Sequence, residues 1–278
     1  MDRKVIIMGA AIMLASCGGQ KWHEEPQDSY IRIVQKGGPT LGYSPESGIG
    51  IITKNGYAFK DLNRNGQLDR YEDWRLDIEE RIADLAGQIS LEEIAGLMLY
   101  SSHQAVPTAE ITNAQKQFLS EDNLRHVLVT TVGSPEIAAR WNNNVQAFVE
   151  GLGHGIPANN SSDPRHGSVS DSEFNAGAGG DISMWPNEIG MGATFSPELM
   201  YEFGKIASTE YRALGFTTAL SPQADLGTDP RWFRFSGTYS EDPKLVSDLV
   251  QAYCDGFQTS TGADALYGAW GMNSVNAM

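Results

Sequence analysis

Apolar positions recur along the chain with two different periods. Between residues 74 and 89 apolar side chains return every three or four positions, which predicts an amphipathic helix. Ser90 and Glu93 form a capping box before the next apolar run and predict a second helix. Three more helices are expected to begin at the pairs Ser134-Pro135, Ser196-Pro197 and Asp242-Pro243, because proline favours the first helical turn.

Short apolar runs lie between these helices. Residues 126–131 and 216–220 are rich in β-branched and apolar side chains and predict buried strands. Strand, loop and helix therefore repeat in that order. This alternation predicts an α/β protein with a parallel sheet. The pattern by itself leaves a (β/α) barrel and a doubly wound sheet open.

Composition and charge narrow the class of partner. The chain has 278 residues, of which 41% are hydrophobic, and this suits one large domain or part of a bigger one. The formal net charge is −15, with no basic stripe in the sequence. Without a basic stripe to neutralise phosphates, the charge argues against nucleic acid as a partner and against electrostatic attraction to anionic lipid. A neutral substrate fits the charge better.

The first 17 residues are typical of a bacterial lipoprotein signal peptide. Arg3 and Lys4 precede an apolar run, and L-A-S-C ends at Cys17, the cysteine expected to be lipidated. A short buried strand or helix is the alternative. The lipid would be the only membrane contact of an exported, anchored protein in the periplasm or at the cell surface. Cys254 is the one other cysteine, so no intrachain disulfide is expected in the mature chain.

Residues 18–55 are rich in Gly, Gln, Ser, Pro and charge, and we interpret them as a tether and N-terminal extension with at most one strand, at residues 30–34. Residues 56–75 contain D-L-N-R-N-G-Q-L-D-R-Y-E, which fits the calcium-loop template D-x-[DN]-x-[DN]-G-x5-E at every specified place. The candidate ligands are Asp61, Asn63, Asn65, Gln67, Asp69 and Glu72. The pattern predicts a structural Ca²⁺, and a plain Asn/Asp/Gly turn is the alternative.

A second polar stretch follows the strand expected at residues 216–220. It brings acids, arginines and aromatic rings into one loop: Asp225, Asp229, Arg231, Trp232, Arg234, Tyr239 and Glu241. Charged groups bind hydroxyls through forked hydrogen bonds and rings cover apolar sugar faces, so this set suits a polyhydroxylated ligand. An arginine–carboxylate network that only braces the loop is the alternative.

Three segments resemble motifs of glycoside hydrolase family 3, the β-glucosidase-like enzymes. They are A-L-S-P-Q-A-D-L-G-T-D-P-R-W-F-R followed by T-Y-S-E-D-P-K-L-V, then I-P-A-N-N-S-S-D-P-R-H-G, and W-P-N-E-I-G-M-G-A-T-F-S-P-E-L. The resemblance implies a (β/α)8 TIM-type barrel, of which residues 76–278 would be about the N-terminal half. In such barrels the site lies at the carboxyl ends of the strands.

The resemblance also implies a set of substrate-holding residues. Asp163 and Arg234 match the family residues that grip hydroxyls of the terminal sugar. Arg231 and His166 lie in the same motifs and are further candidates for substrate binding. Phe233 stands where the family has glycine, and many members have Gly or Phe at the positions of Asn159 and Asn160, so the pocket wall differs from the family pattern.

The implied reaction is hydrolysis by a retaining, exo-acting β-glycosidase, most nearly a β-glucosidase, that removes terminal non-reducing β-D-glucosyl residues from oligosaccharides or glycosides without a catalytic cofactor. The family's nucleophile lies in an S-D-aromatic motif, which no Ser-Asp pair of this chain matches. The nucleophile and the acid/base are therefore expected downstream of Met278, and the chain is expected to be a truncated, inactive part of the enzyme. A non-catalytic glycan-binding surface lipoprotein is the alternative.

Overall fold

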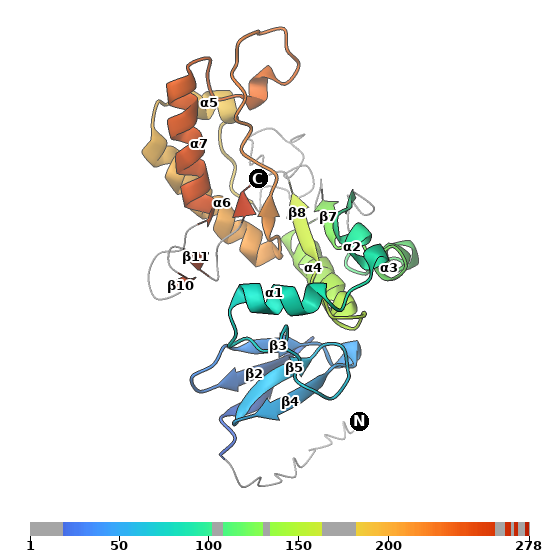
Figure 1. Ribbon diagram of the computed structural model, residues 1–278. Coiled ribbons are helices and arrows are strands. Elements are labelled where there is room, and N and C mark those ends of the chain that lie inside the picture. Colours follow the sequence, from blue (N-terminus) through green and yellow to red (C-terminus); the bar gives the residue numbers. More distant parts are fainter. Residues whose placement is uncertain are drawn as a thin grey trace, which may run out of the picture. The chain divides into compact units, whose positions relative to one another are not determined.

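The computed structural model describes residues 19–101, 108–129, 134–162 and 182–258, and the backbone of three short strands between residues 265 and 277 (Figure 1). The chain divides into two compact units, Met1–Leu85 and Ala86–Met278. The division falls in the last turn of helix α1 (Ile78–Ala86). The N-terminal unit contains two small antiparallel sheets, and the C-terminal unit contains a parallel sheet.

The N-terminal unit is made of antiparallel strands. β1 (Trp22–Pro26), β2 (Ile31–Gln35) and β3 (Leu41–Tyr43) form one sheet in chain order, and β4 (Gly50–Lys54) pairs with β5 (Tyr57–Asp61), with the 3-10 turn η1 (Pro45–Ser47) between β3 and β4. The hairpin turn is Asn55-Gly56, whose φ angles of 56° and 83° suit a two-residue loop. The prediction that residues 18–55 form a tether with at most one strand is therefore wrong.

Two polar or aromatic side chains explain why this segment folds. The Gln35 side chain accepts from Ala58 N at 3.0 Å and donates to Pro39 O at 2.8 Å, so it connects β2 to β5. Trp74 stacks on Phe59 with ring centroids 5.2 Å apart and donates from Nε1 to Ala58 O at 3.0 Å. Because Trp74 packs on the strands, α1 begins only at Ile78, later than the apolar period predicted.

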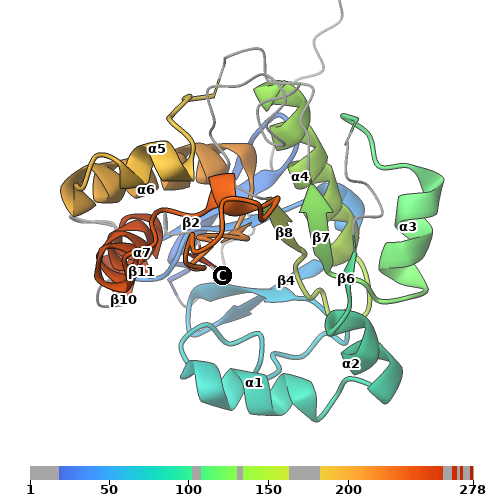
Figure 2. The same ribbon diagram turned by 90° about the horizontal axis from the view of Figure 1, so that it is seen from above.

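The C-terminal unit contains a five-stranded parallel sheet in the order β12-β9-β8-β7-β6. Its strands are β6 (Tyr100–Ser101), β7 (His126–Val129), β8 (Asn159–Ser162), β9 (Thr218–Ala219) and β12 (Asn276–Ala277). The helices are α2 (Leu91–Leu97), α3 (Asn113–Ser120), α4 (Pro135–Glu150), α5 (Glu188–Gly192), α6 (Pro197–Leu214) and α7 (Pro243–Gln258) (Figure 2). A 3-10 turn, η2 (Phe235–Gly237), and an antiparallel pair, β10 (Ala265–Tyr267) and β11 (Trp270–Gly271), complete the unit. The predicted α/β class with a parallel sheet is confirmed.

The predicted helix starts are confirmed by their caps. Ser134 Oγ accepts from Ile137 N at 3.2 Å at the start of α4, and Ser196 Oγ accepts from Leu199 N at 3.1 Å at the start of α6. In α7 the same role falls to a carboxylate, because Asp242 Oδ1 accepts from Leu245 N at 2.8 Å. Each bond satisfies a backbone N–H that has no partner inside the helix. The capping box of α2 is present as well.

The core of this unit lies among the sheet and helices α4, α6 and α7. Its largest fully buried side chains include Trp141, Tyr211, Phe216, Tyr253 and Phe257. Helices α6 and α7 lie side by side in both views (Figures 1 and 2), and a Cβ added at Gly256 would come within 2.5 Å of Tyr201 O. Glycine is therefore needed there for the close approach of the two helices.

Candidate active site

The carboxyl ends of β8 and β9 meet at one edge of the parallel sheet. Ser161 pairs with Thr218 and Ser162 with Ala219, so the segments that follow the two strands leave the sheet next to each other. The segment after β9 is the polar loop of residues 220–242. Asp163 and His166 come after β8 in the chain and lie outside the described residues. In α/β sheets this edge is where binding sites are formed.

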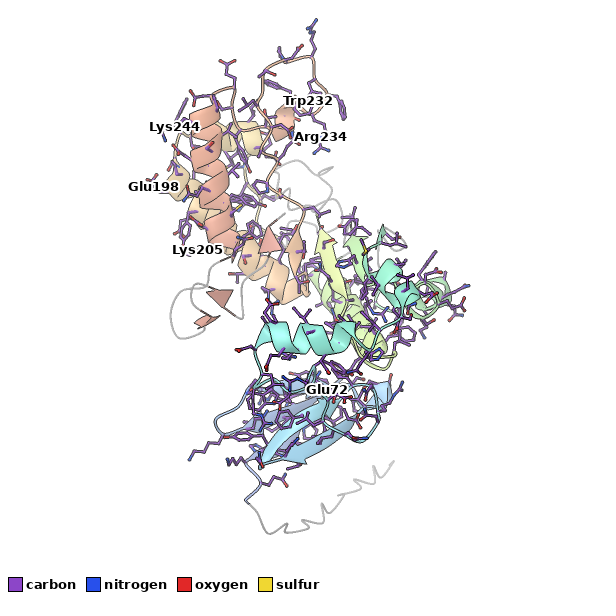
Figure 3. All side chains as sticks on the ribbon, in the orientation of Figure 1. Glu72, Glu198, Lys205, Trp232, Arg234 and Lys244 are labelled. Carbon is purple, nitrogen blue, oxygen red and sulfur yellow. The ribbon has the colours of Figure 1, made fainter. Side chains whose placement is uncertain are left out.

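Arg234 lies in the loop between β9 and α7, with an exposed side chain (Figure 3). Its Nη2 and Nε donate to Gln223 Oε1 at 2.7 and 3.1 Å, and Gln223 Nε2 donates back to Arg234 O at 3.4 Å. The guanidinium is therefore oriented by a neutral amide, which does not cancel its positive charge. A cation oriented in this way can bind sugar hydroxyls or a carboxylate.

Arg231 is arranged differently. It forms a forked ion pair with Asp229, from Nε to Oδ1 at 3.0 Å and from Nη2 to Oδ2 at 2.7 Å, and the same Oδ1 accepts from Arg231 N at 2.9 Å. The pair is exposed, and the Arg231 guanidinium lowers the pKa of the Asp229 carboxyl. For this half of the loop the structure matches the alternative in which an arginine–carboxylate pair braces the turn.

The aromatic residues of the loop divide between surface and core. Phe233 is 88% exposed, and Trp232, labelled beside Arg234 in Figure 3, is half-buried. Tyr239, which the sequence placed with the ligand-binding rings, is only 4% exposed and belongs to the hydrophobic core. Burial raises the pKa of its hydroxyl. Tyr239 therefore anchors the end of the loop in the core and does not line its exposed surface.

Strand β8 is polar although it is buried, a feature that the sequence analysis missed. Asn160 points to α4, where its Nδ2 donates to Asn142 Oδ1 at 2.6 Å. Asn159 faces the other side of the sheet, and its Oδ1 accepts from the hydroxyls of Thr217 and Thr218 at 2.8 and 2.7 Å. Of the two asparagines that depart from the family pattern, Asn160 thus packs against a helix. The unbroken polar run N-N-S-S before Asp163 is the signal that could have indicated this network.

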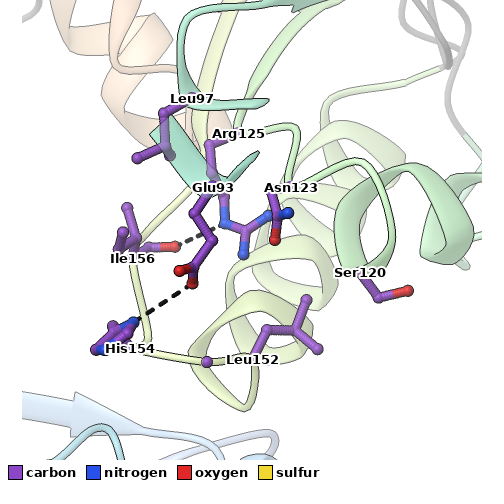
Figure 4. A pocket seen from close by; sticks show the side chains of 9 residues that line it. Glu93, Leu97, Ser120, Asn123, Arg125, Leu152, His154 and Ile156 are labelled. Atoms are coloured by element: carbon purple, nitrogen blue, oxygen red, sulfur yellow. Dashed lines mark hydrogen bonds and ion pairs between the residues drawn. The ribbon is translucent and has the colours of Figure 1, made fainter. Parts of the chain in front are cut away.

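A small pocket lies at the opposite ends of the strands, where β7 and β8 begin (Figure 4). Its buried Arg125 donates from Nε to Ile156 O at 3.1 Å, and burial lowers the Arg125 pKa. Beside it, His154 Nδ1 lies 3.4 Å from Glu93 Oε1. These side chains are held by the backbone and by each other at the amino edge of the sheet, away from the polar loop. We therefore assign the pocket no part in substrate binding.

The predicted calcium ligands lie at the last residue of β5, Asp61, and in the loop that follows it, in the N-terminal unit. Among the residues that the structure describes, no three His, Cys, Asp or Glu side chains lie close enough together to hold a metal ion by themselves. Cys17 falls outside the described residues, so its lipidation stays a prediction. Within the described part of the chain, no helix combines the length and the apolar character needed to span a membrane.

Known proteins of similar sequence and structure cover most of this chain. A periplasmic beta-glucosidase/beta-xylosidase from Dickeya chrysanthemi is 41% identical over 226 residues, which are 76% of this chain and 33% of that protein. Beta-glucosidase C from Emericella nidulans is 33% identical over 204 residues, 71% of this chain and 32% of that protein. A β-glucosidase structure from Erythrobacter marinus is 25% identical, with a TM-score of 0.57 over 75% of this chain and 26% of that one.

These relatives are much longer, and this chain spans about a third of their length. The family model described as "Glycosyl hydrolase family 3 N terminal domain" matches residues 78–274, which include β6 to β11, the polar loop and all helices after α1. That match covers well over half of the chain. The chain belongs to glycosyl hydrolase family 3.

Proposed function

We propose that the protein containing this chain is a retaining, exo-acting β-glycosidase, most nearly a β-glucosidase, acting on terminal β-D-glucosyl residues of oligosaccharides or glycosides. The match of residues 78–274 to the N-terminal domain of the family carries this proposal. The names of the relatives, a β-glucosidase/β-xylosidase and a β-glucosidase, support glucosides and xylosides as substrates.

In this proposal the sheet of the C-terminal unit is part of a (β/α)8 barrel, and the polar loop after β9 is part of the sugar site. Arg234 would bind hydroxyls of the terminal sugar together with Asp163, while Arg231 and His166 would have lesser roles. The support is the position of the loop at the carboxyl ends of neighbouring strands and the uncommitted charge of Arg234. Hydrogen bonds to sugar hydroxyls that tighten in the transition state supply part of the catalysis.

The chemistry itself needs two carboxyl groups, one that attacks the anomeric carbon and one that first donates and then accepts a proton, about 5 Å apart. We propose that both come from residues beyond the 278 of this chain, because no Ser-Asp pair within it is followed by an aromatic residue. The 278 residues alone should then release no nitrophenol from aryl β-glucosides. A longer protein that contains this chain together with the rest of the family's catalytic region should.

The assay that tests the proposal compares p-nitrophenyl β-D-glucoside with the β-D-xyloside on the extended protein. We expect turnover of one or both, with the β-anomeric configuration retained in the first product. Inversion at the anomeric carbon, or binding of glycans without any hydrolysis, would contradict the proposal. A ratio of kcat/KM values then assigns the sugar.

Export is part of the same proposal. We infer that Cys17 is lipidated and holds the enzyme on a bacterial membrane, which is supported by the basic start, the apolar run and L-A-S-C, and by the word periplasmic in the name of one relative. Cys17→Ser should accumulate as an unprocessed precursor. If this variant is processed and retained on the membrane like the parent, the anchor is wrong.

A further inference from the structure

The loop that follows β5 closes around two buried carboxylates. Glu72, labelled in Figure 3, is 5% exposed and turns back into the loop, where Oε1 accepts from Leu62 N at 2.7 Å and Oε2 accepts from Asp69 N at 3.0 Å. Asp61, at the start of the loop, is 7% exposed and accepts through Oδ2 from Gly66 N at 3.0 Å. Both acids therefore face the inside of the loop.

Two further side chains of the same loop donate hydrogen bonds to one carboxylate oxygen of a third. Asn63 Nδ2 and Asn65 Nδ2 donate to Asp69 Oδ2 at 2.6 and 2.8 Å. The amide oxygens of the two asparagines accept from Asn65 N at 3.1 Å and Gln67 N at 2.7 Å. An oxygen that accepts one hydrogen bond keeps a second lone pair, so these groups still have ligand capacity. The side chains at loop positions three, five and nine thus meet, and those at positions one and twelve bond backbone N–H groups of the same loop.

An independent observation indicates that something else belongs inside the loop. Asp61 Oδ1 is buried and has no hydrogen-bond partner in the described part of the chain. The carboxylate faces the loop interior, because its other oxygen reaches across to Gly66 N. A buried carboxylate oxygen without a donor or a cation is unfavourable, and native proteins rarely leave one. A cation within the loop would satisfy it directly.

We propose that residues 61–72 bind one Ca²⁺ through oxygen atoms of Asp61, Asn63, Asn65, Asp69 and Glu72 and the backbone carbonyl of Gln67. Six or seven oxygens in a flexible loop suit Ca²⁺, whereas Mg²⁺ demands strict octahedral geometry and keeps its waters. The three carboxylates of Asp61, Asp69 and Glu72 are thus joined by two amide oxygens and one backbone carbonyl. Arg64 and Gly66, with φ angles of 60° and 74°, let the backbone turn around the ion.

The surroundings of the loop indicate a structural role for the ion. In helix–loop–helix calcium sensors the ion changes the angle between two helices. Here the loop leaves strand β5 and continues into turns, which lead to Trp74 and its stacking contact with Phe59. Calcium would therefore stiffen the connection between the β5 hairpin and the Trp74 segment, and would stabilise the N-terminal unit without a conformational switch.

The test is calorimetric titration of the chelator-treated protein with CaCl₂, and with MgCl₂ as a separate titrant, together with its melting temperature. We expect one Ca²⁺ per chain, weaker binding of Mg²⁺ and a higher melting temperature in calcium than in chelator, because a ligand of the native state alone stabilises it. Folded protein that takes up no calcium, or binds Mg²⁺ as tightly, overturns the proposal.

Two exposed neighbours in the loop form a matched pair of variants. Asn65→Ala removes a side-chain ligand and should weaken calcium binding roughly tenfold or more. Gln67→Ala leaves the backbone carbonyl in place and should bind as the parent does. Because neither side chain is in the core, both variants should fold. Equal affinity in the two variants would move the calcium to another site and overturn the assignment.

Discussion

Two loops of this molecule, residues 61–72 and residues 229–234, are made of similar polar residues but use them in opposite ways. In the first loop, the carboxylates of Asp61 and Glu72 are buried and accept hydrogen bonds from backbone N–H groups. In the second, the exposed carboxylate of Asp229 pairs with the side chain of Arg231. Backbone donors hold Asp61 and Glu72 inside their own loop, whereas Asp229 adds a side-chain ion pair at the surface to its one backbone bond. Burial therefore separates the proposed ion site from the proposed ligand-binding surface.

The largest effect should come from Arg234→Ala in a catalytically active protein that contains this chain. The Arg234 guanidinium is held by Gln223 and should bind hydroxyls of the sugar. Its loss should lower kcat/KM for an aryl β-glycoside by roughly 10²–10³-fold, which corresponds to about 3–4 kcal/mol of transition-state binding. The protein should keep its melting temperature, because the side chain is exposed.

Arg231→Ala is the matched control for this variant. Arg231 is occupied by Asp229 on the surface, so its loss should change kcat/KM much less than the loss of Arg234. If the two variants lose activity equally, the distinction between a bracing arginine and a substrate-binding arginine is wrong. If Arg234→Ala keeps parental kinetics, the sugar site lies elsewhere.

The second largest effect should be on stability, in Glu72→Ala measured in chelator. This change leaves three backbone donors without their acceptor, the N–H groups of Leu62, Asn63 and Asp69. We expect a loss of about 2–4 kcal/mol in the free energy of unfolding, because bonds to a charged acceptor are lost in a buried site. Chemical denaturation gives the total, and hydrogen exchange at these amides localises it.

Glu79→Ala is the control, since Glu79 is exposed on the nearby helix α1. Surface changes of this kind stay within about 0.5 kcal/mol. A similar loss in both variants would mean that the charge of the unit matters more than the bonds of Glu72.

The sequence predicted local features, such as helix starts, better than it predicted the position of single residues in the fold. Ser134, Ser196 and Asp242 were sufficient to predict three helix starts, because a cap and a following proline act within one turn. The tether over residues 18–55 was wrong because a polar composition hid the period-two pattern around Ile33, which is fully buried. Strand pairing depends on distant partners, so composition alone is a weak guide to it.

The same limit applies to the candidate site. The sequence grouped Tyr239 with Arg234 because they lie close in the chain, but the end of the loop returns to the core and buries the Tyr239 ring. Asn160 was placed in a pocket wall, and the structure directs it to Asn142 on α4. Which face a residue takes is decided by strand register and by helix packing, neither of which a motif records. Asp163 and His166 lie outside the described residues, so their roles stay predictions.

A smaller effect on stability is expected from substitutions of two glycines, Gly66 and Gly227, which are required for different reasons. Gly66 has a φ angle of 74° and open space around it, so Gly66→Ala should cost about 1 kcal/mol from backbone conformation alone. Gly66→Asn should cost less, because asparagine tolerates this conformation. Just before the second loop the reason for glycine is space, since a Cβ at Gly227 would lie 2.7 Å from Thr238 Oγ1.

Thermal denaturation of the substitutions at both glycines checks this difference. At Gly227 alanine should be tolerated better than asparagine, because every added atom increases the clash with Thr238 and Phe235. If alanine and asparagine rank in the same order of stability at both positions, backbone conformation at Gly66 and steric clash at Gly227 are not the two separate causes.

The smallest effect, and the last, is a pH dependence of opposite sign in the two loops. Burial raises the pKa of Glu72. In chelator, the native state therefore holds a proton that the unfolded chain has already released, and stability falls as pH rises from about 4.5 through the folded pKa. Arg231 lowers the pKa of Asp229, so its contribution is present above about pH 4 and is lost as pH falls through the folded pKa.

The two signs can be measured with isosteric variants. Glu72→Gln should remove the fall in stability with rising pH in chelator, and calcium should mask that fall in the parent, because the ion requires the deprotonated carboxylate. Asp229→Asn should change the melting temperature near neutral pH only within experimental scatter, since the pair is fully exposed and screened by salt. A marked destabilisation by Asp229→Asn at neutral pH would mean that the second loop is braced as firmly as the first. The contrast between a buried carboxylate site and an exposed binding surface would then fail.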